Sequence, residues 1–434
     1  MIIAVCDALM LLTCTFVAGI SYRRMFRTSR TALVDLVVIV VYMFMCLPIV
    51  FNYTVGIPTY DTAYWYKVFL PGMADEGTVF LYDIYVVLVM LALHFYGTNR
   101  LKNDDHVSSE FKVENWRWIM ELAVALPLIF IVISGNLTKY TIYADSLARG
   151  LNDSFVFIEN CALFLSLFCF TLLYFSTPER TKRHLLVLFF YTFLVAWISG
   201  KRFIVALSLI MYLFAFLTTE KNTVKRNHLY KTLPILVAGL VGFSGFYMAV
   251  IKPLTNTINY DVYEMLRVDF GRDDVTKYVI YQMNVLGRQI VDYPGETILS
   301  FILFFVPRQI WPTKPFQHYQ YLTSSILRVP ITQLPAGTTP SGFEMFFANF
   351  GLLGMPLFAL ALVLFIKLFD SSNTTMPLRL LGLVLCLVLL TQSIDVYLVY
   401  VVLAVVLLIR RAIKGRDAKL YQADPIGVGF HNAK

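Results

Sequence analysis

Apolar stretches of about 15 to 25 residues recur along almost the whole chain, and a stretch of about 20 is enough for an α-helix to cross a membrane. The chain has 434 residues, of which 58% are hydrophobic and only 15% are charged, too few to cover the surface of a soluble protein of this size. We therefore expect an all-α polytopic membrane protein with about eleven transmembrane helices, at 2–20, 32–51, 79–96, 118–134, 154–175, 184–199, 203–218, 233–250, 344–368, 378–393 and 395–409.

Lysine and arginine are divided unequally between the two sets of segments that connect these stretches. One set holds 23 of them, whereas the other holds five outside residues 251–343. Basic residues favour the cytoplasmic side, so the first set is expected to be cytoplasmic and the bias explains the net charge of +8 without nucleic acid. Ile2–Ile20 lacks the flanks of a signal peptide and is expected to be a retained span. The amino terminus is then outside and the carboxyl terminus is cytoplasmic.

The same bias divides the chain into regions. Residues 1–250 form an expected bundle of about eight spans, and 344–409 contain about three more. Residues 410–434 form a short cytoplasmic tail that we expect to be poorly ordered. Residues 251–343 form a hydrophilic extracytoplasmic loop with eight lysine and arginine residues, on the side where the other loops have few. A loop that departs this far from the bias is expected to bind something anionic.

The cysteines indicate neither disulfides nor a metal site. All six lie within apolar stretches without metal-ligand spacing, and they are Cys6, Cys14, Cys46, Cys161, Cys169 and Cys386. We interpret them as small buried apolar residues.

Two helical segments are expected inside the long loop. Apolar residues from Val275 to Ile290 recur at helical spacing, and Lys277 and Arg288 lie on the opposite face, which predicts an amphipathic helix on the membrane. Thr297–Val306 is apolar but has only about ten residues, so it is expected to be interfacial or re-entrant. A twelfth span there would place the basic tail outside. The dense group around Arg267, Arg272, Asp273 and Asp274 is interpreted as pairing internally.

Three short motifs place candidate site residues on the outer side. The turn Ser199-Gly200-Lys201-Arg202 holds two cations at the membrane boundary, and VPRQIWPTKP fixes Arg308 on a rigid proline-rich path. His318 follows as the only outer histidine. In SGFEMFFANFGLLG, Glu344 lies where a span enters the membrane. There it suits either a general base or an acidic residue at a helix N-terminus.

Taken together, VPRQIWPTKP, SGFEMFFANFGLLG and SGKRF resemble the Wzy-type polymerases of O-antigen and capsular polysaccharide. The chain length, the number of spans and the large late outer loop are also similar. The loop lacks the arginine followed eleven residues later by glycine that some members carry, so their functional residues are not transferred.

The resemblance implies a GT-C-like glycosyltransferase of the bacterial inner membrane. Such an enzyme moves a growing glycan from undecaprenyl pyrophosphate onto a lipid-linked oligosaccharide repeat unit, and arginines can stabilise the departing diphosphate without a metal or cofactor. The expected partners are these lipid-linked glycans and membrane lipids, and a chain-length regulator is left open. The candidate catalytic residues are Glu344, Arg308, His318 and Asp292, and the candidate substrate-binding residues are Lys201, Arg202, Arg272, Arg288, Trp311, Lys314, Tyr319 and Tyr321.

Other functions stay open at this point. A flippase or transporter of lipid-linked sugars needs polar groups near the membrane midplane, and Glu121 and Glu159 lie near the ends of their predicted spans. An O-antigen ligase shares the donor chemistry and differs in its acceptor. A eukaryotic lumenal GT-C enzyme favours an acidic motif in the first outer loop, which Asp75-Glu76 matches poorly. The pairs Asp75-Glu76 and Asp273-Asp274 also keep a divalent metal ion open.

Overall fold

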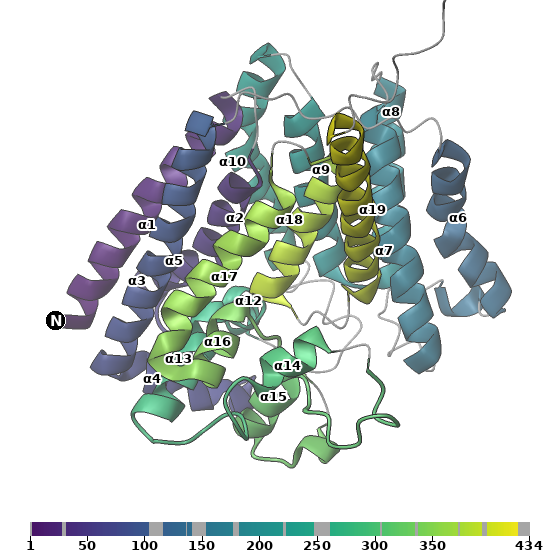
Figure 1. The fold of residues 1–434 in the computed structure, drawn as a ribbon. Helices are drawn as coiled ribbons and strands as arrows, with labels where there is room; N and C mark the ends of the chain where they lie inside the picture. Colours follow the sequence, from purple (N-terminus) through teal and green to yellow (C-terminus); the bar gives the residue numbers. More distant parts are fainter. Residues whose placement is uncertain are drawn as a thin grey trace, which may run out of the picture.

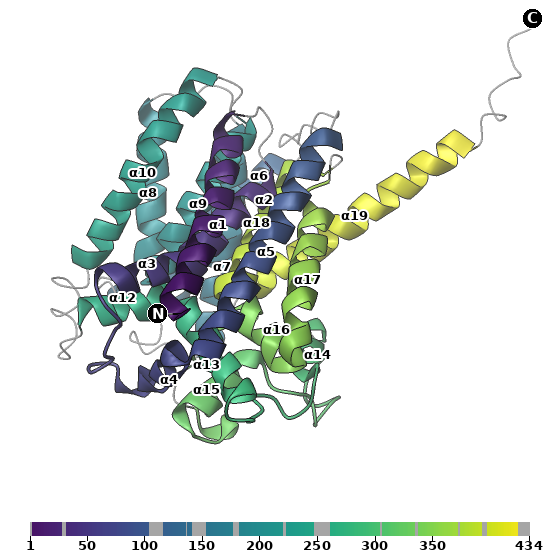
Figure 2. The same cartoon turned by 90° about the vertical axis from the view of Figure 1, so that its left-hand side faces the viewer.

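All regular structure in the described part of the chain is helical (Figures 1 and 2). The computed structural model describes residues 2–27, 32–103, 116–135, 137–140, 153–176, 182–219, 223–246, 261–303, 306–334, 337–371, 374–392 and 397–423. The helices of the bundle are α1 (Ile2–Arg27), α2 (Leu33–Val41), η1 (Tyr42–Cys46), α3 (Leu47–Thr54), α5 (Glu76–Asn103), α6 (Arg117–Ser134), α7 (Asp153–Ser176), α8 (Lys182–Ser199), α9 (Arg202–Thr219), α10 (Thr223–Phe246), α17 (Gly354–Phe369), α18 (Met376–Thr391) and α19 (Leu398–Ala423).

The bundle helices coincide with the predicted apolar stretches, each of which contains a helix. Within the described residues, five segments are long and apolar enough to cross a membrane, namely Ile3–Arg27, Leu33–Thr54, Glu76–Arg100, Phe155–Ser176 and Gly342–Phe369, the last of which is interrupted at Gly351. Three more helices are apolar but shorter, namely Arg183–Ser199, Phe203–Thr219 and Met376–Thr391. The chain is therefore a multi-pass helical membrane protein, and the number of eleven crossings stays a prediction.

Basic side chains tie the helix ends together at one end of the bundle. Arg24 donates to Asp35 over 2.9 Å, and Asp370 accepts from both Arg100 and Arg379. Arg226 donates over 2.7 Å to the backbone carbonyls of Met25 and Leu217. These contacts bring segments of the predicted cytoplasmic set to the same end.

Short helices gather at the opposite end (Figure 1). They are η2 (Tyr64–Phe69), α4 (Leu70–Ala74), α12 (Val262–Phe270), α13 (Arg272–Asn284), α14 (Glu296–Ile302), α15 (His318–Leu327), η6 (Ile331–Gln333) and α16 (Gly342–Phe350). The seven residues of α14 are about 10 Å long and cannot cross a membrane, as expected for this part of the loop.

The expected amphipathic helix differs from what the periodicity predicts. Helix α13 ends at Asn284, and all residues from Arg272 to Ile280 are buried. It packs against α4, α5 and α16, and Gly72 of α4 lets the two backbones approach, since a Cβ there would lie 3.0 Å from the Lys277 carbonyl oxygen. The predicted amphipathic helix therefore ends before Arg288, and neighbouring helices cover its polar residue Lys277. Its position relative to the membrane stays a prediction.

The predicted span 344–368 is not one continuous helix. Gly351 breaks it at a φ of 58°, and the rings of Phe343 and Phe358 lie 4.8 Å apart. In an unbroken helix, these residues would be about 22 Å apart along the axis. Helix α16 therefore folds back beside α17, which leaves its first turn, including Glu344, buried against α13 and α18.

The carboxyl-terminal tail also differs from expectation. Helix α19 continues past Arg410 to Ala423, and Figure 2 shows it projecting away from the other helices. At its base, Arg411 donates to the hydroxyls of Ser371 and Thr374. A helix that starts in the bundle thus continues through the polar sequence, and the poor order expected for the tail stays a prediction.

The close approach of α16 and α17 predicts that Gly354 does not tolerate a larger side chain. A Cβ on Gly354 would overlap the carbonyl of Phe346, whereas a Cβ on Gly19 of α1 meets no atom within 4 Å. Gly354→Ala should therefore destabilise the protein by about 1–3 kcal/mol. Thermal unfolding of the purified protein in detergent measures this, with Gly19→Ala as the matched control. Equal melting temperatures for both variants would contradict the hairpin.

Candidate functional site

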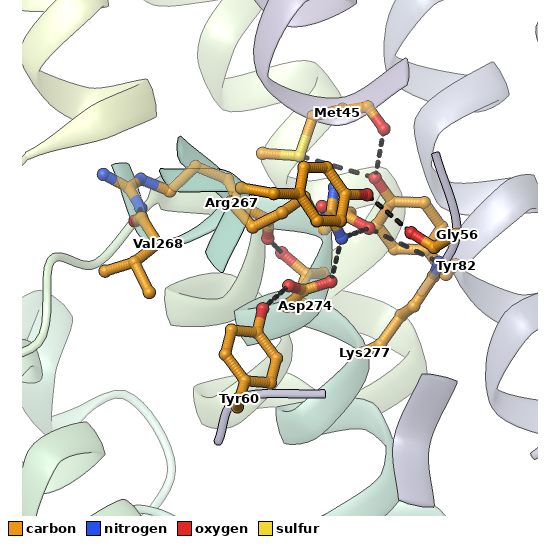
Figure 3. A network of polar contacts seen from close by, with 12 residues as sticks. Met45, Gly56, Tyr60, Tyr82, Arg267, Val268, Asp274 and Lys277 are labelled. Atoms are coloured by element: carbon orange, nitrogen blue, oxygen red, sulfur yellow. Dashed lines mark hydrogen bonds and ion pairs between the residues drawn. The ribbon is translucent and has the colours of Figure 1, made fainter. Parts of the chain in front are cut away.

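Five polar side chains form a buried cluster at the loop end of the bundle (Figure 3). This α13 cluster consists of Tyr60, Arg267, Asp273, Asp274 and Lys277, each 3% exposed or less. Nη2 of Arg267 lies 3.1 Å from Oδ2 of Asp273 and also donates to Asp274, and Nζ of Lys277 lies 3.6 Å from the same Asp273 oxygen. The hydroxyl of Tyr60 donates to Asp274, and Lys277 lies over the Tyr82 ring at 4.7 Å.

A second carboxylate explains why Tyr60 reaches this cluster. Glu264 of α12 accepts hydrogen bonds from the backbone N–H groups of Asp61 and Thr62 over 2.6 and 3.0 Å. Although burial raises its pKa, these hydrogen bonds hold the pKa of Glu264 below its ordinary value. The ionised carboxylate thus fastens the loop before η2 onto α12. Tyr60, at a φ of 54°, then lies over Asp274.

The two aspartates differ in their electrostatics although they are adjacent. Burial raises the pKa of Asp274 to about 7. Arg267 lowers this pKa, and the adjacent Asp273 carboxylate raises it. Burial also acts on Asp273, but Arg267 and Lys277 together hold its pKa below the ordinary value. The two adjacent carboxyls of the cluster therefore differ in acidity, with Asp273 the more acidic.

A small cavity opens beside the cluster. Its lining includes Tyr60, Tyr66, Arg267, Arg272, Asp274 and Thr338, and we call it the arginine cavity. Arg272 is 4% exposed and donates to the carbonyls of Val268 and Thr391 over 3.3 and 3.4 Å. Nε and Nη1 of Arg267 are buried without a hydrogen-bond partner among the described residues. Buried guanidinium donors of this kind suit an anion.

A second small cavity is lined by neutral groups. We call it the His318 cavity, and its lining includes Thr297, Phe301, Gln317, His318, Ser341 and Gln392. Neither ring nitrogen of His318 has a hydrogen-bond partner within the described chain. Burial lowers the pKa of His318 to about 3, so the imidazole is neutral and offers one donor and one acceptor. Such a lining suits a neutral, hydroxyl-bearing ligand with an apolar face.

One short stretch of the chain contributes to the walls of both cavities. Thr338 and Thr339 line the arginine cavity, whereas Pro340, Ser341 and Gly342 line the His318 cavity. Behind them lies Glu344, fully buried, which accepts from the backbone and hydroxyl of Ser341 in a capping box and lies 3.4 Å from the Thr276 hydroxyl. The alternative interpretation of Glu344 as an N-terminal helix residue is therefore confirmed. Glu344 lines neither cavity, but its hydrogen-bond partner Ser341 lines the His318 cavity.

The proline-rich residues hold their own turn together. Arg308 is exposed, donates to the carbonyls of Lys314 and Pro315 over 2.7 and 3.4 Å, and stacks on Phe316 at 4.3 Å. Lys314 is buried and donates to the Val306 carbonyl over 2.9 Å, and Trp311 bonds to Thr313. None of these side chains lines either cavity.

The other candidate residues lie farther from the cavities. Tyr321 donates to Glu296 and to Asp292 over 3.2 and 3.3 Å, and Tyr319 packs closely against Gly337. Arg288 is exposed. Lys201 is exposed at the turn between α8 and α9, where Arg202 begins α9 with a side chain outside the described residues. Of the twelve candidates, the structure thus brings Arg272, His318 and Glu344 together around the cavities.

Some residues of the site cannot be identified from the sequence alone. The internal pairing predicted for Arg267, Asp273 and Asp274 is confirmed. Tyr60 has no local signal, because its partner lies 214 residues away. The described residues hold no group of three or more acidic, histidine or cysteine side chains that could bind a metal ion.

Comparison of the chain with protein-family models, curated proteins and solved structures found no match.

The raised pKa of Asp274 predicts a pH-dependent effect of its substitution. Its folded pKa of about 7 exceeds the unfolded value of 3.8, so its protonated form stabilises the fold at low pH and this contribution is lost as pH rises to about 7. Relative to the wild type, Asp274→Asn should therefore gain stability with rising pH, by on the order of 1 kcal/mol per pH unit.

Thermal unfolding at a series of pH values between the two pKa values measures this difference. Asp261→Asn, at the exposed cap of α12, serves as the control and should show no comparable trend. A constant or falling difference for Asp274→Asn would contradict the assignment.

Proposed function

We propose that this protein is a membrane glycosyltransferase that polymerises oligosaccharide repeat units carried on undecaprenyl pyrophosphate. The observation that carries the proposal is the arginine cavity, where Arg267 and Arg272 are buried at the loop end of a helical membrane bundle. A diphosphate that leaves during transfer develops negative charge, and guanidinium groups fixed in advance stabilise that charge without reorganising. The resemblance of the loop motifs to Wzy-type polymerases points to the same chemistry.

The paired cavities fit a reaction with two glycan substrates. The arginine cavity would hold the diphosphate of the donor, and the neutral His318 cavity would hold a sugar of the acceptor. In the reaction, an acceptor hydroxyl attacks the anomeric carbon, the bond to the diphosphate breaks, and a base removes the hydroxyl proton. His318 lines the acceptor cavity and Glu344 bonds to Ser341 in its wall, which favours them over Asp292 and Arg308 as groups that act on the acceptor.

Transport of a lipid-linked sugar is the second candidate, and one observation favours it. Asp7 of α1 and Asp83 of α5 are 5% and 4% exposed, inside helices long enough to cross a membrane. Buried ionisable groups in such helices are typical of transporters. Ligase activity shares the donor chemistry of the polymerase.

Loss of Arg272 should stop polymerisation. In a strain that depends on this gene for its polysaccharide, Arg272→Gln should remove the polymer ladder on a gel and leave single lipid-linked repeats to accumulate, since the leaving diphosphate loses a fixed cation. Arg328→Gln removes an exposed charge at the end of α15 and should leave the ladder intact.

Immunoblots of the membrane fraction, together with the Arg272→Lys variant, distinguish a loss of catalysis from a loss of folding. A variant present at wild-type level with no polymer supports the proposal, whereas a normal ladder from Arg272→Gln refutes it. Accumulated repeats that stay on the cytoplasmic side would indicate the transport candidate instead.

The proposal also requires the short helices to face away from the cytoplasm. A cysteine introduced at the exposed Thr313 should react with a membrane-impermeant maleimide in spheroplasts, whereas one at Arg410 should react only after permeabilisation. The native cysteines lie in apolar helices and provide the background, which the parent protein measures. The reverse pattern would place the arginine cavity in the cytoplasm and exclude an undecaprenyl diphosphate donor presented outside.

A further inference from the structure

A row of aromatic side chains leads from the surface of the molecule to the arginine cavity. Helix η2 is a 3-10 helix, and its three-residue period places Tyr66 and Phe69 on one face, where both line the cavity. Tyr64 and Trp65 lie on its other faces and are 67% and 38% exposed, whereas Tyr66 is half-buried and Tyr60 is fully buried. The aromatic row, which consists of Tyr64, Trp65, Tyr66 and Tyr60, therefore runs from water into the wall of the cavity.

Neighbouring rings of the aromatic row are in contact. The ring centroid of Trp65 lies 4.8 Å from that of Tyr64 and 6.2 Å from that of Tyr66. The ring of Tyr66 lies in turn 5.9 Å from that of Tyr60. The ring planes are inclined to one another by 52° to 66° and are not stacked face to face, so the exposed rings do not fully cover one another's faces.

The aromatic row is held firmly on the bundle. Glu264 accepts from the hydroxyl of Thr59 over 3.1 Å and from the backbone N–H of Thr62 over 3.0 Å, on either side of Tyr60. Helix η2 also packs against α13 and α15. Tyr60 has a φ of 54°, which is unusual for a residue other than glycine and persists only where the surrounding structure enforces it. Rings that are fixed in advance lose little conformational entropy when a ligand binds.

The surroundings of the aromatic row favour a sugar over a lipid chain. Lys67 donates to Asp61 over 2.6 Å, and the two side chains are 49% and 68% exposed. A hydrocarbon chain on this surface would remove these charges from water, whereas sugar hydroxyls can form hydrogen bonds with them. The apolar C–H face of a sugar ring packs on the face of an aromatic ring. The row thus combines aromatic faces with polar groups at their edge.

We propose that the aromatic row binds an oligosaccharide and holds the glycan whose diphosphate end occupies the arginine cavity. Several weak sugar contacts beside one anion site raise the affinity for a diphosphate that carries a glycan above the affinity for the diphosphate alone. The identity of this glycan as the growing chain of the donor rests on the proposed function, whereas the binding of sugars to the row does not.

Binding of lipid-free oligosaccharides to the full-length protein in nanodiscs tests the aromatic row directly. The probe is a repeat-unit oligosaccharide prepared by partial hydrolysis of the polysaccharide of the strain described above, and calorimetry measures its affinity. Trp65→Ala and Tyr64→Ala should each weaken binding by about threefold to tenfold, whereas Trp65→Phe should retain most of it. Trp118→Ala removes a ring of α6 that is 67% exposed and should bind like the wild type. No binding by the wild type, or equal binding by both alanine variants, refutes the row.

Fluorescence quenching distinguishes a sugar site from a membrane anchor. The emission of Trp65 is the difference between the wild type and Trp65→Phe. It should be quenched by acrylamide, protected from acrylamide by the oligosaccharide and unaffected by brominated lipids. Quenching by brominated lipids would place the row in the membrane interface and refute the proposal. Because both substituted rings are exposed, the alanine variants should keep the melting temperature of the wild type, which separates lost contacts from lost folding.

The polymer ladder separates this inference from the proposed function. The double variant Tyr64→Ala, Trp65→Ala should still form polymer, but with shorter chains, because the arginines are retained and only the hold on the growing glycan is weaker. A ladder of unchanged length refutes this role of the row. Oligosaccharide binding that is lost in Trp65→Ala, together with a normal ladder from Arg272→Gln, would support the sugar site and refute the polymerase.

Discussion

The burial of Arg267 between Asp273 and Asp274 is the interaction on which the loop end of the molecule depends. An ionised side chain removed from water costs several kcal/mol unless charges of the opposite sign surround it. That requirement fixes how α12 meets α13, because only the turn at Gly271 brings Arg267 back over the first turn of the next helix. Tyr60 and Glu264 then fasten the first loop to the same pair of helices. Helix α13 is consequently enclosed by neighbouring helices.

The same burial prepares the site for an anion. Arg267 uses one nitrogen for both aspartates, which leaves its other two donors next to the arginine cavity. The partial neutrality of Asp274 near pH 7 prevents the aspartates from cancelling the positive charge of Arg267 and Lys277. A fixed, water-poor arrangement of this kind stabilises negative charge more strongly than flexible surface cations, such as Lys201 and Arg288, can. For that reason, the structure favours Arg272 and Arg267 as the anion-binding groups.

Hydropathy was sufficient to predict where the bundle helices lie, because a membrane requires long apolar helices and little else resembles them. Hydropathy failed to predict the features of the fold that depend on tertiary contacts. Lys277 has the spacing of a solvent-facing residue but is covered by helices from elsewhere in the chain. Gly351 lies in an apolar run, where the reversal between α16 and α17 gives no break in hydropathy. A single aspartate such as Asp83 likewise does not interrupt an apolar stretch. For the candidate site, the sequence predicts that cations are present, whereas the partner of Tyr60 can be identified only from the fold.

The two ends of the bundle differ in how completely their buried charged groups are hydrogen-bonded. This difference indicates at which end the chemistry occurs. At the end where α1, α5 and α18 meet, every carboxylate oxygen of Asp35 and Asp370 that is buried has a hydrogen-bond partner, and the arginines lock helix ends together. At the α13 end, Asp83, Arg267 and His318 keep buried polar atoms without partners in the described chain. Complete pairing stabilises a fold, whereas an unpaired buried group costs about 1–3 kcal/mol and persists where a ligand or proton completes it. Arg267 and His318 line the two cavities, so the end of the molecule where these buried groups lack partners in the described chain is the one equipped to bind.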